Sequence, residues 1–284
     1  MNHHSVIETF EYNLFYCFLV IYPNMRRQIY SFITIALACF LAVSCAKKAE
    51  TESVIMAKNP AQIAETLTKS ENLFKERTDT AKLREAVKML SAARNPESRN
   101  YEVEWKFAKY NFFLGKQTAD EKESEKAFTD GASAGGIASR IESNKPDGFF
   151  WYAANLGEQA KKSPVTIGLK AVGDIQTAMN KVIEIDPQYQ GASAFDALAQ
   201  IELATRLTGG KAEKAVEYLE KALELDKNNT YIYLHLAEAY LVVGKKGEAK
   251  KQLEYLLKMK ENPEYAVEYK ETTEKAKKLL ETKF

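Results

Sequence analysis

Beyond residue 45 this chain of 284 residues contains no cysteine and only one histidine, His235. The cysteines are Cys17, Cys39 and Cys45, and the other histidines are His3 and His4. A disulfide framework, a zinc site of cysteine and histidine ligands and a cysteine–histidine nucleophile pair are therefore excluded from the body of the protein. We expect no metal, no cofactor and no enzymatic activity, and we expect His235 to be a partly solvated helix residue.

An excess of charge of one sign is also missing. The chain has 40 Lys and Arg against 39 Asp and Glu, which gives a formal net charge of +1. A protein that neutralises many phosphates needs a basic excess, so we expect no nucleic-acid partner. The hydrophobic fraction of 45% is too high for a disordered chain and is typical of a globular one.

The N-terminal part has the pattern of a secretory signal. Met25-Arg26-Arg27 is followed by an apolar stretch from Ile29 to Val43, and Ser44 precedes Cys45. An apolar run of about 15 residues is too short to span a bilayer comfortably. We expect residues 25–44 to be a lipoprotein signal peptide, with a plain signal peptide or an uncleaved membrane helix as alternatives.

Cys45 is the predicted lipidation site. Residues 41–45 resemble a bacterial lipobox, although Leu41 lies four residues before the cysteine instead of three. Two or three acyl chains on one residue hold a protein durably at a membrane. The polar residues 45–58 would then form a tether, and Lys47 favours the outer membrane under the enterobacterial sorting rule.

Residues 1–24 contain a second apolar run, from Leu14 to Tyr22, which ends at Pro23. Because a complete signal begins at Met25, we interpret residues 1–24 as an upstream mis-start extension. A membrane hairpin of two helices is the alternative.

The body of the protein, residues 59–284, has the pattern of a helical repeat array. Apolar residues recur at spacings of three and four, and no window sustains the alternation of a strand. A period of 34 residues relates Gly210, Ala215 and Leu219 to Gly244, Ala249 and Leu253. This is the tetratricopeptide period, so the sequence predicts an all-α superhelix of tetratricopeptide-like repeats.

We expect four to five helix pairs and a C-terminal capping helix over residues 264–281. The cap is needed because a repeat cannot bury its apolar face alone. A four-residue insertion before Ala215 is predicted to lengthen the preceding helix, which contains Leu198, by about one turn.

Three segments resemble the T-component (TatT-like) family of TRAP-transporter-associated lipoproteins. They are residues 72–77 with 83–86, residues 150–157 (Phe-Trp-Tyr-Ala-Ala-Asn-Leu-Gly) and residues 183–187 (Ile-Glu-Ile-Asp-Pro). The resemblance covers roughly residues 60–260, and the run from Trp151 to Gly157 is its most specific part. It departs from the family pattern at residues 189–193, where a Gly-Gly and basic segment is expected.

The resemblance implies an envelope lipoprotein that can form trimers. It also implies cooperation with a periplasmic TRAP-type solute-binding protein, and a channel in each protomer for a small apolar or organic-acid ligand.

The candidate ligand-binding residues are aromatic and amide side chains. Trp151 and Asn155 are four residues apart on one predicted helix, so an aromatic ring and a polar amide share one face of it. Tyr152 lies on the same helix. Phe112 and Phe113 could enlarge the same pocket. The alternative is packing, because aromatic residues at helical spacing usually belong to a core.

Residues 131–135 read Gly-Ala-Ser-Ala-Gly, the G-x-S-x-G string of an esterase elbow. An elbow needs a preceding strand, but residues 121–130 are a charged helical stretch. We therefore expect these small residues to allow close helix approach, and catalysis by Ser133 is a remote hypothesis.

Two non-enzymatic functions remain. The first is a lipid-anchored accessory of a TRAP-type system, and the second is a general tetratricopeptide scaffold for envelope assembly without a small ligand. For the second, repeat geometry would turn Tyr231, Leu234, Glu238 and Leu241 toward a concave groove that binds a peptide, unless the capping helix fills that groove.

Overall fold

The computed structural model describes residues 59–163 and 167–284. The predicted extension, signal peptide, lipidated Cys45 and tether lie outside the described residues.

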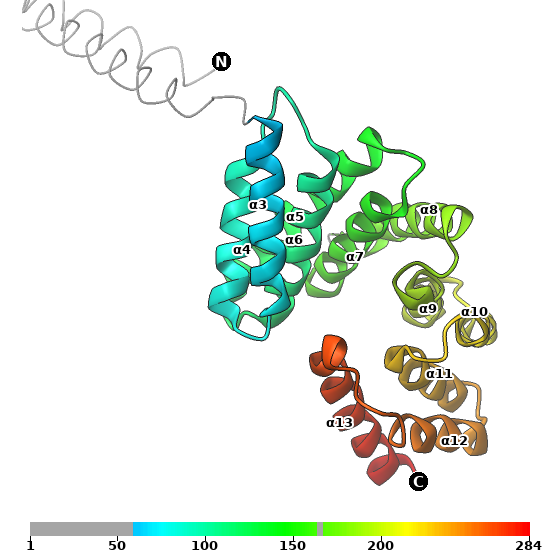
Figure 1. Cartoon of the computed structure of the whole chain (residues 1–284). Coiled ribbons are helices and arrows are strands. Elements are labelled where there is room, and N and C mark those ends of the chain that lie inside the picture. Colours follow the sequence, from blue (N-terminus) through cyan, green and yellow to red (C-terminus); the bar gives the residue numbers. More distant parts are fainter. Residues whose placement is uncertain (1–58, 164–166) are drawn as a thin grey trace, which may run out of the picture. The chain divides into compact units, whose positions relative to one another are not determined.

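The described residues form eleven α-helices and no strand (Figure 1). Consecutive helices form five pairs, and an eleventh helix follows them. The helices are α3 (Pro60–Lys75), α4 (Thr80–Ala93), α5 (Tyr101–Gln117), α6 (Glu121–Ile141), α7 (Pro146–Lys162), α8 (Leu169–Ile185), α9 (Tyr189–Ala204), α10 (Ala212–Leu225), α11 (Thr230–Val242), α12 (Lys246–Leu256) and α13 (Ala266–Lys283). The predicted all-α array of helix pairs with a capping helix is confirmed.

Several helices begin where a short polar side chain caps them. Asn59 accepts a hydrogen bond from the N–H of Ala61, and the Gln62 side chain accepts one from the N–H of Asn59. Such caps satisfy amides that the first helical turn leaves without partners. A side-chain cap also starts four more helices, at Asp79, Asn100, Asp120 and Asn229.

The alanine and leucine positions of the 34-residue period lie in the core of the C-terminal repeats. Ala215, Leu219, Ala249 and Leu253 are all fully buried. Burying one leucine side chain stabilises a fold by roughly 1.5–3 kcal/mol, whereas alanines let neighbouring helices approach. The repeated pattern is therefore the pattern of helix-to-helix contact.

The first helices of successive pairs contact one another: α3 with α5, α5 with α7, α7 with α9, and α9 with α11. We call this row the inner layer. The capping helix α13 contacts α11 and α12. Every predicted ligand-binding residue lies on α5 or α7, and therefore in the inner layer.

The glycine- and serine-containing segment 131–135 lies inside α6. A β-carbon added to Gly131 would lie 2.3 Å from the Asn155 side-chain oxygen, so α6 and α7 approach closely there. Ser133 is exposed on a regular helix. The interpretation of this segment as a packing face is confirmed.

The predicted lengthening of the helix around Leu198 is wrong. Helix α9 ends at Ala204, and the inserted residues form a separate 3-10 turn, Arg206–Thr208. Gly209, at φ 120°, breaks the helical path, and a β-carbon on Gly210 would lie 2.3 Å from the Glu202 carbonyl oxygen. Leu207 at the tip of this turn is fully exposed.

Helix α9 opens with a left-handed turn at the segment that departs from the family pattern. Gln190, Gly191 and Ala192 have φ angles of 50°, 62° and 59°. The Asn229 side chain donates hydrogen bonds to the Gly191 carbonyl oxygen at 2.9 Å and to Ser193 Oγ at 3.1 Å. These bonds fix the unusual backbone against the start of α11.

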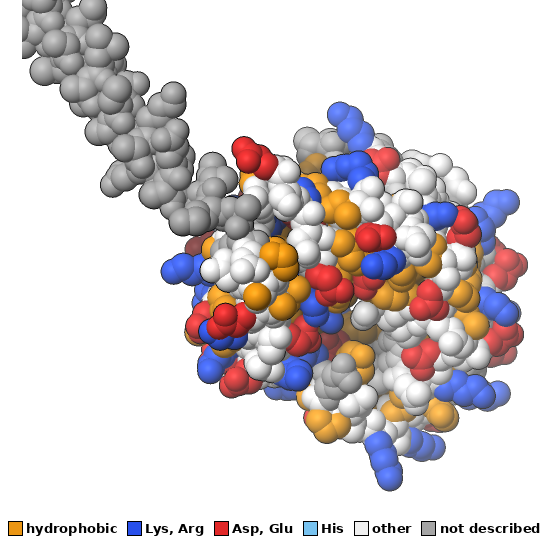
Figure 2. All heavy atoms as spheres, turned by 45° about the horizontal axis from the view of Figure 1, so that its top comes forward, with side chains coloured by type: hydrophobic (Ala, Val, Ile, Leu, Met, Phe, Trp, Pro, Cys, Tyr) orange, Lys and Arg blue, Asp and Glu red, His pale blue; other side chains and the backbone are white. Residues whose placement is uncertain are grey.

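Charged side chains of both signs are intermixed with apolar ones on the face shown in Figure 2. Among the helices of residues 59–284 that the structure describes, none combines the length and apolar character required to cross a bilayer.

Candidate functional site

The predicted residues Phe112, Phe113 and Trp151 meet in the inner layer. The Trp151 ring centroid lies 5.6 Å from that of Phe112 and 6.0 Å from that of Phe113. Phe74 of α3 extends the group, since its ring lies 5.3 Å from Phe113 and stacks on Tyr110 at 4.2 Å. We call these five residues the aromatic cluster.

Two cations lie over the faces of these rings. The Arg77 guanidinium carbon is 5.1 Å from the Phe74 centroid and 5.3 Å from that of Phe113. Lys109 Nζ is 4.8 Å from Phe74 and 5.8 Å from Trp151. Cations at this range are attracted by the ring quadrupole, so positive charge is concentrated beside an apolar surface.

Asn155 is fully buried and joins α7 to α5. Its Nδ2 donates to the Ala108 carbonyl oxygen at 3.1 Å and to that of Trp151 at 2.7 Å. Its Oδ1 and the Trp151 Nε1 are buried and have no hydrogen-bond partner among the described residues. The Asn155 Oδ1 lies against Gly131 of α6, so this acceptor is on the side of α7 that packs on α6.

The ring of Tyr152 packs on α6 and is not in contact with the rings of the other predicted residues. Its ring is next to Gly136 on α6. Burial, together with the neighbouring Asp174 carboxylate, raises its pKa. Among the described contacts, no ring of the aromatic cluster touches Tyr152.

The capping helix reaches back to the first repeats. Arg77 Nη2 lies 3.7 Å from Glu268 Oε1, and Lys116 Nζ lies 4.0 Å from Glu271 Oε1. The Tyr231 hydroxyl of α11 donates to Glu271 at 2.5 Å. Burial favours the neutral form of Glu271, but its bonds to Lys275 and Tyr231 and the charge of Lys116 outweigh burial and lower its pKa.

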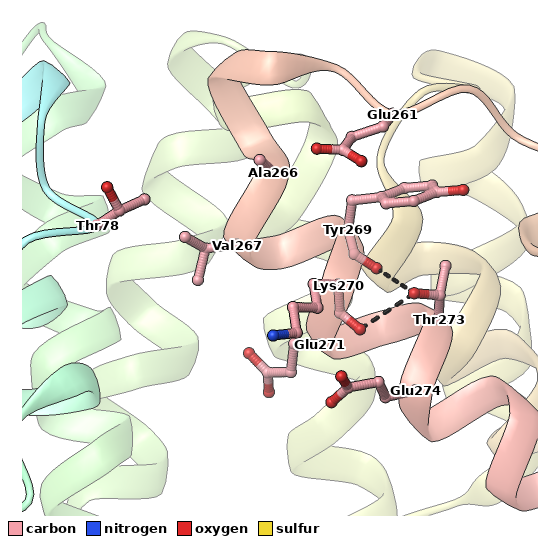
Figure 3. Close-up of a pocket in the computed structure, with 9 residues that line it drawn as sticks. All are labelled: Thr78, Glu261, Ala266, Val267, Tyr269, Lys270, Glu271, Thr273 and Glu274. Carbon is pink, nitrogen blue, oxygen red and sulfur yellow. Dashed lines mark hydrogen bonds between the residues drawn. The ribbon is translucent and has the colours of Figure 1, made fainter.

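A hollow of 670 Å³ separates α13 from the turn that follows α3 (Figure 3). Val267 points toward Thr78 on that turn, and Glu271 and Glu274 lie further along the helix (Figure 3). Arg77 links the capping helix to the aromatic cluster, because it contacts Glu268 on one side and Phe74 on the other.

The predicted groove on α11 is partly occupied. Tyr231 contacts the capping helix as described, which agrees with the alternative that this helix fills the groove, and Leu234 is fully buried. His235 Nδ1 lies 2.7 Å from Asp196 Oδ1 on α9. Burial opposes the charged ring, but the Asp196 carboxylate more than offsets it and raises the pKa of His235.

No group of three or more histidine, cysteine, aspartate or glutamate side chains in the described part of the chain is arranged to hold a metal ion.

Two known families match parts of the chain. The family described as "Regulator of microtubule dynamics protein 1-3" matches residues 66–194, and a family described as "Tetratricopeptide repeat" matches residues 206–266. The second match covers α10, α11 and α12, where the 34-residue period lies. No curated protein sequence matches the chain significantly.

A solved structure shares the architecture at low sequence identity. A thermophilic TPR protein of Thermus thermophilus, TTC0263, is 16% identical with a TM-score of 0.55, over 74% of this chain and 97% of that chain. The described residues form an all-α array of tetratricopeptide-like helix pairs. The Pseudomonas aeruginosa pilF structure is 16% identical with a TM-score of 0.45, over 78% of this chain and 91% of that chain.

The charged residues beside the aromatic cluster and on the capping helix were not identified from the sequence. Arg77 and Lys109 resemble any solvated helix charge in the sequence, and Glu268 and Glu271 resemble the polar side of a cap. One available signal was the spacing of Lys109, Phe113 and Lys116, which places two cations and a ring on one side of α5.

Proposed function

We propose that this protein is a non-enzymatic scaffold of the bacterial envelope, anchored by acyl chains on Cys45 with its body in the periplasm. In this proposal the outer membrane holds the anchor. The partner is a TRAP-type solute-binding protein, and a small organic acid is the ligand. Oligomers, with trimers as the family resemblance implies, belong to the same proposal.

The observation that carries the ligand is the pair of cations over the aromatic cluster. Arg77 and Lys109 supply positive charge, the rings of Phe113 and Trp151 supply apolar contact, and Trp151 Nε1 is a buried donor without an acceptor among the described residues. A carboxylate on an apolar body matches these groups. Phe112 lies against the same rings, and Asn155 holds α7 to α5 through its hydrogen bond to the Ala108 carbonyl oxygen.

The anchor contributes through confinement. A tethered scaffold meets membrane-bound partners at a raised effective concentration without any new contact. A repeat array of this kind is a protein-interaction scaffold, because stacked helix pairs present a long surface.

A general envelope scaffold without a small ligand is the second candidate. Two observations favour it. The rings contact one another directly, and the Asn155 side-chain amide donates both of its hydrogen bonds to backbone carbonyl oxygens inside the fold. In this case the aromatic cluster is core.

Native mass spectrometry of the full-length protein in detergent, mixed with a solute-binding protein encoded nearby, tests the two candidates. The first predicts a complex that carries a small acid, and Lys109→Gln should release that acid while Lys122→Gln, an exposed residue of α6, should not. Persistent monomers that carry no small molecule and ignore the solute-binding protein would reject the first candidate.

A further inference from the structure

The capping helix places two carboxylates on two cations of the first repeats. Glu268 and Glu271 are three residues apart on α13, so they lie one above the other on one face. They meet Arg77, directly after α3, and Lys116 on α5. These two cations are therefore already paired with carboxylates of one helix, supplied by the chain itself.

The first half of α13 is held mainly by polar contacts. Toward the N-terminal repeats these are the two ion pairs, and the hollow beside Thr78 shows that apolar packing is incomplete there. Further along, Ala276 is fully buried, and Leu279 and Leu280 pack against the C-terminal core cluster. The second half of the helix is thus fastened by apolar packing, whereas the first half is held by the two ion pairs and by hydrogen bonds, including that of the Tyr269 hydroxyl to the Met259 carbonyl oxygen.

We propose that Arg77 and Lys116 form a docking surface for a glutamate-rich helical segment of a partner protein, and that α13 occupies this surface until the partner displaces its first half. Charge complementarity selects the partner, because a segment with carboxylates one turn apart reproduces the contacts of Glu268 and Glu271. The cationic ring contacts of Arg77 on Phe74 and Phe113 hold the guanidinium in place for either occupant.

This inference rests on the proposed role as a protein scaffold and names the chemistry of the partner segment. It can fail while docking of a solute-binding protein still holds, because the peptide and the solute-binding protein are measured separately.

The test uses a labelled alanine-based helical peptide of the length of α13 with glutamates three residues apart. A control peptide carries glutamine in their place. Fluorescence anisotropy measures binding to the full-length chain and to its Glu268→Gln/Glu271→Gln variant, whose folding is checked by circular dichroism. In the variant the first half of α13 competes less well for Arg77 and Lys116. The variant should therefore bind the acidic peptide about tenfold more tightly than the unmodified chain. Adding Lys116→Gln should reverse that gain.

A second measurement needs no variant. Hydrogen exchange in residues 266–275 of the unmodified chain should accelerate when the acidic peptide is added, while exchange in residues 276–283 should not change. Equal binding of the acidic and glutamine peptides would overturn the proposal, as would unchanged exchange at saturating peptide or a gain that survives Lys116→Gln.

Discussion

Gly135 of α6 and Tyr152 of α7 pack backbone against backbone: a β-carbon on Gly135 would lie 2.5 Å from the Tyr152 amide nitrogen. Neither backbone can move without separating two helices that are in close contact along their length. The pair therefore fixes the spacing between the second and third repeats.

Gly135→Ala should destabilise the protein by about 1–3 kcal/mol, because overpacking displaces a helix. Gly136→Ala is the matched control, since its β-carbon would meet Tyr152 at an ordinary 3.5 Å. The control should be neutral or slightly stabilising, because alanine favours a helix over glycine. Urea unfolding of both variants measures the difference; equal free energies would show that the two helices are not in close contact.

Glu104 is a fully buried carboxylate held by two arginines. Arg94 Nε donates to it at 2.9 Å and Arg99 Nη1 at 2.7 Å. Glu104→Gln should lower the free energy of unfolding by about 2–4 kcal/mol, because two guanidinium groups lose their counter-charge. Glu102→Gln, on the exposed side of the same helix, should change it by less than about 0.5 kcal/mol. A similar loss of stability in both variants would show that the ion pairs of Glu104 with the two arginines do not stabilise the fold.

The His235–Asp196 pair should make stability depend on pH. The pKa of His235 is raised in the folded state. The contribution of the pair to the free energy of unfolding is therefore fully present below the unfolded pKa of about 6.5 and is lost as pH rises through the folded pKa. Glu238 reinforces the charged ring and Lys161 of α7 opposes it. The stability difference between the unmodified chain and His235→Gln should therefore shrink from about pH 6 to about pH 9. Urea unfolding at both values measures it, and a difference that grows with pH would contradict the sign.

The left-handed turn at the start of α9 predicts a stabilising substitution. Gln190 is exposed and has a φ of 50°, which costs a side-chain-bearing residue roughly 1–2 kcal/mol. Gln190→Gly should raise the free energy of unfolding by up to about 1 kcal/mol after the larger backbone entropy of glycine is counted. Asn180→Gly, in the exposed interior of α8, should instead lower it by about 0.5 kcal/mol. Loss of stability at both positions would argue against the turn.

The repeat spacing and the helix pairs could be predicted because burial recurs with the sequence. Leu219 and Leu253 occupy the same buried position one period apart. The insertion before Ala215 was wrongly predicted to lengthen the preceding helix, because its residues are compatible with a helix. The tight packing of Gly210 against the Glu202 carbonyl oxygen, which the sequence does not reveal, accompanies the turn that forms instead.

The contact between Arg77 and Glu268 could not be predicted. It depends on the total rotation of the superhelix, to which each repeat adds a small amount, and no local pattern in the sequence predicts that total. The same reason applies to the contact of Lys109 on α5 with the Phe74 ring on α3. The aromatic residues were found because ring size and helical spacing are local properties.

The exposed Leu207 gives the protein a convenient reporter position. Because no cysteine follows residue 45, Leu207→Cys would place a single reactive thiol in the repeat domain, on a turn whose side chain makes no contribution to the core. A spin label or dye attached there would report the tumbling of the array and the arrival of a bound protein without disturbing the inner layer.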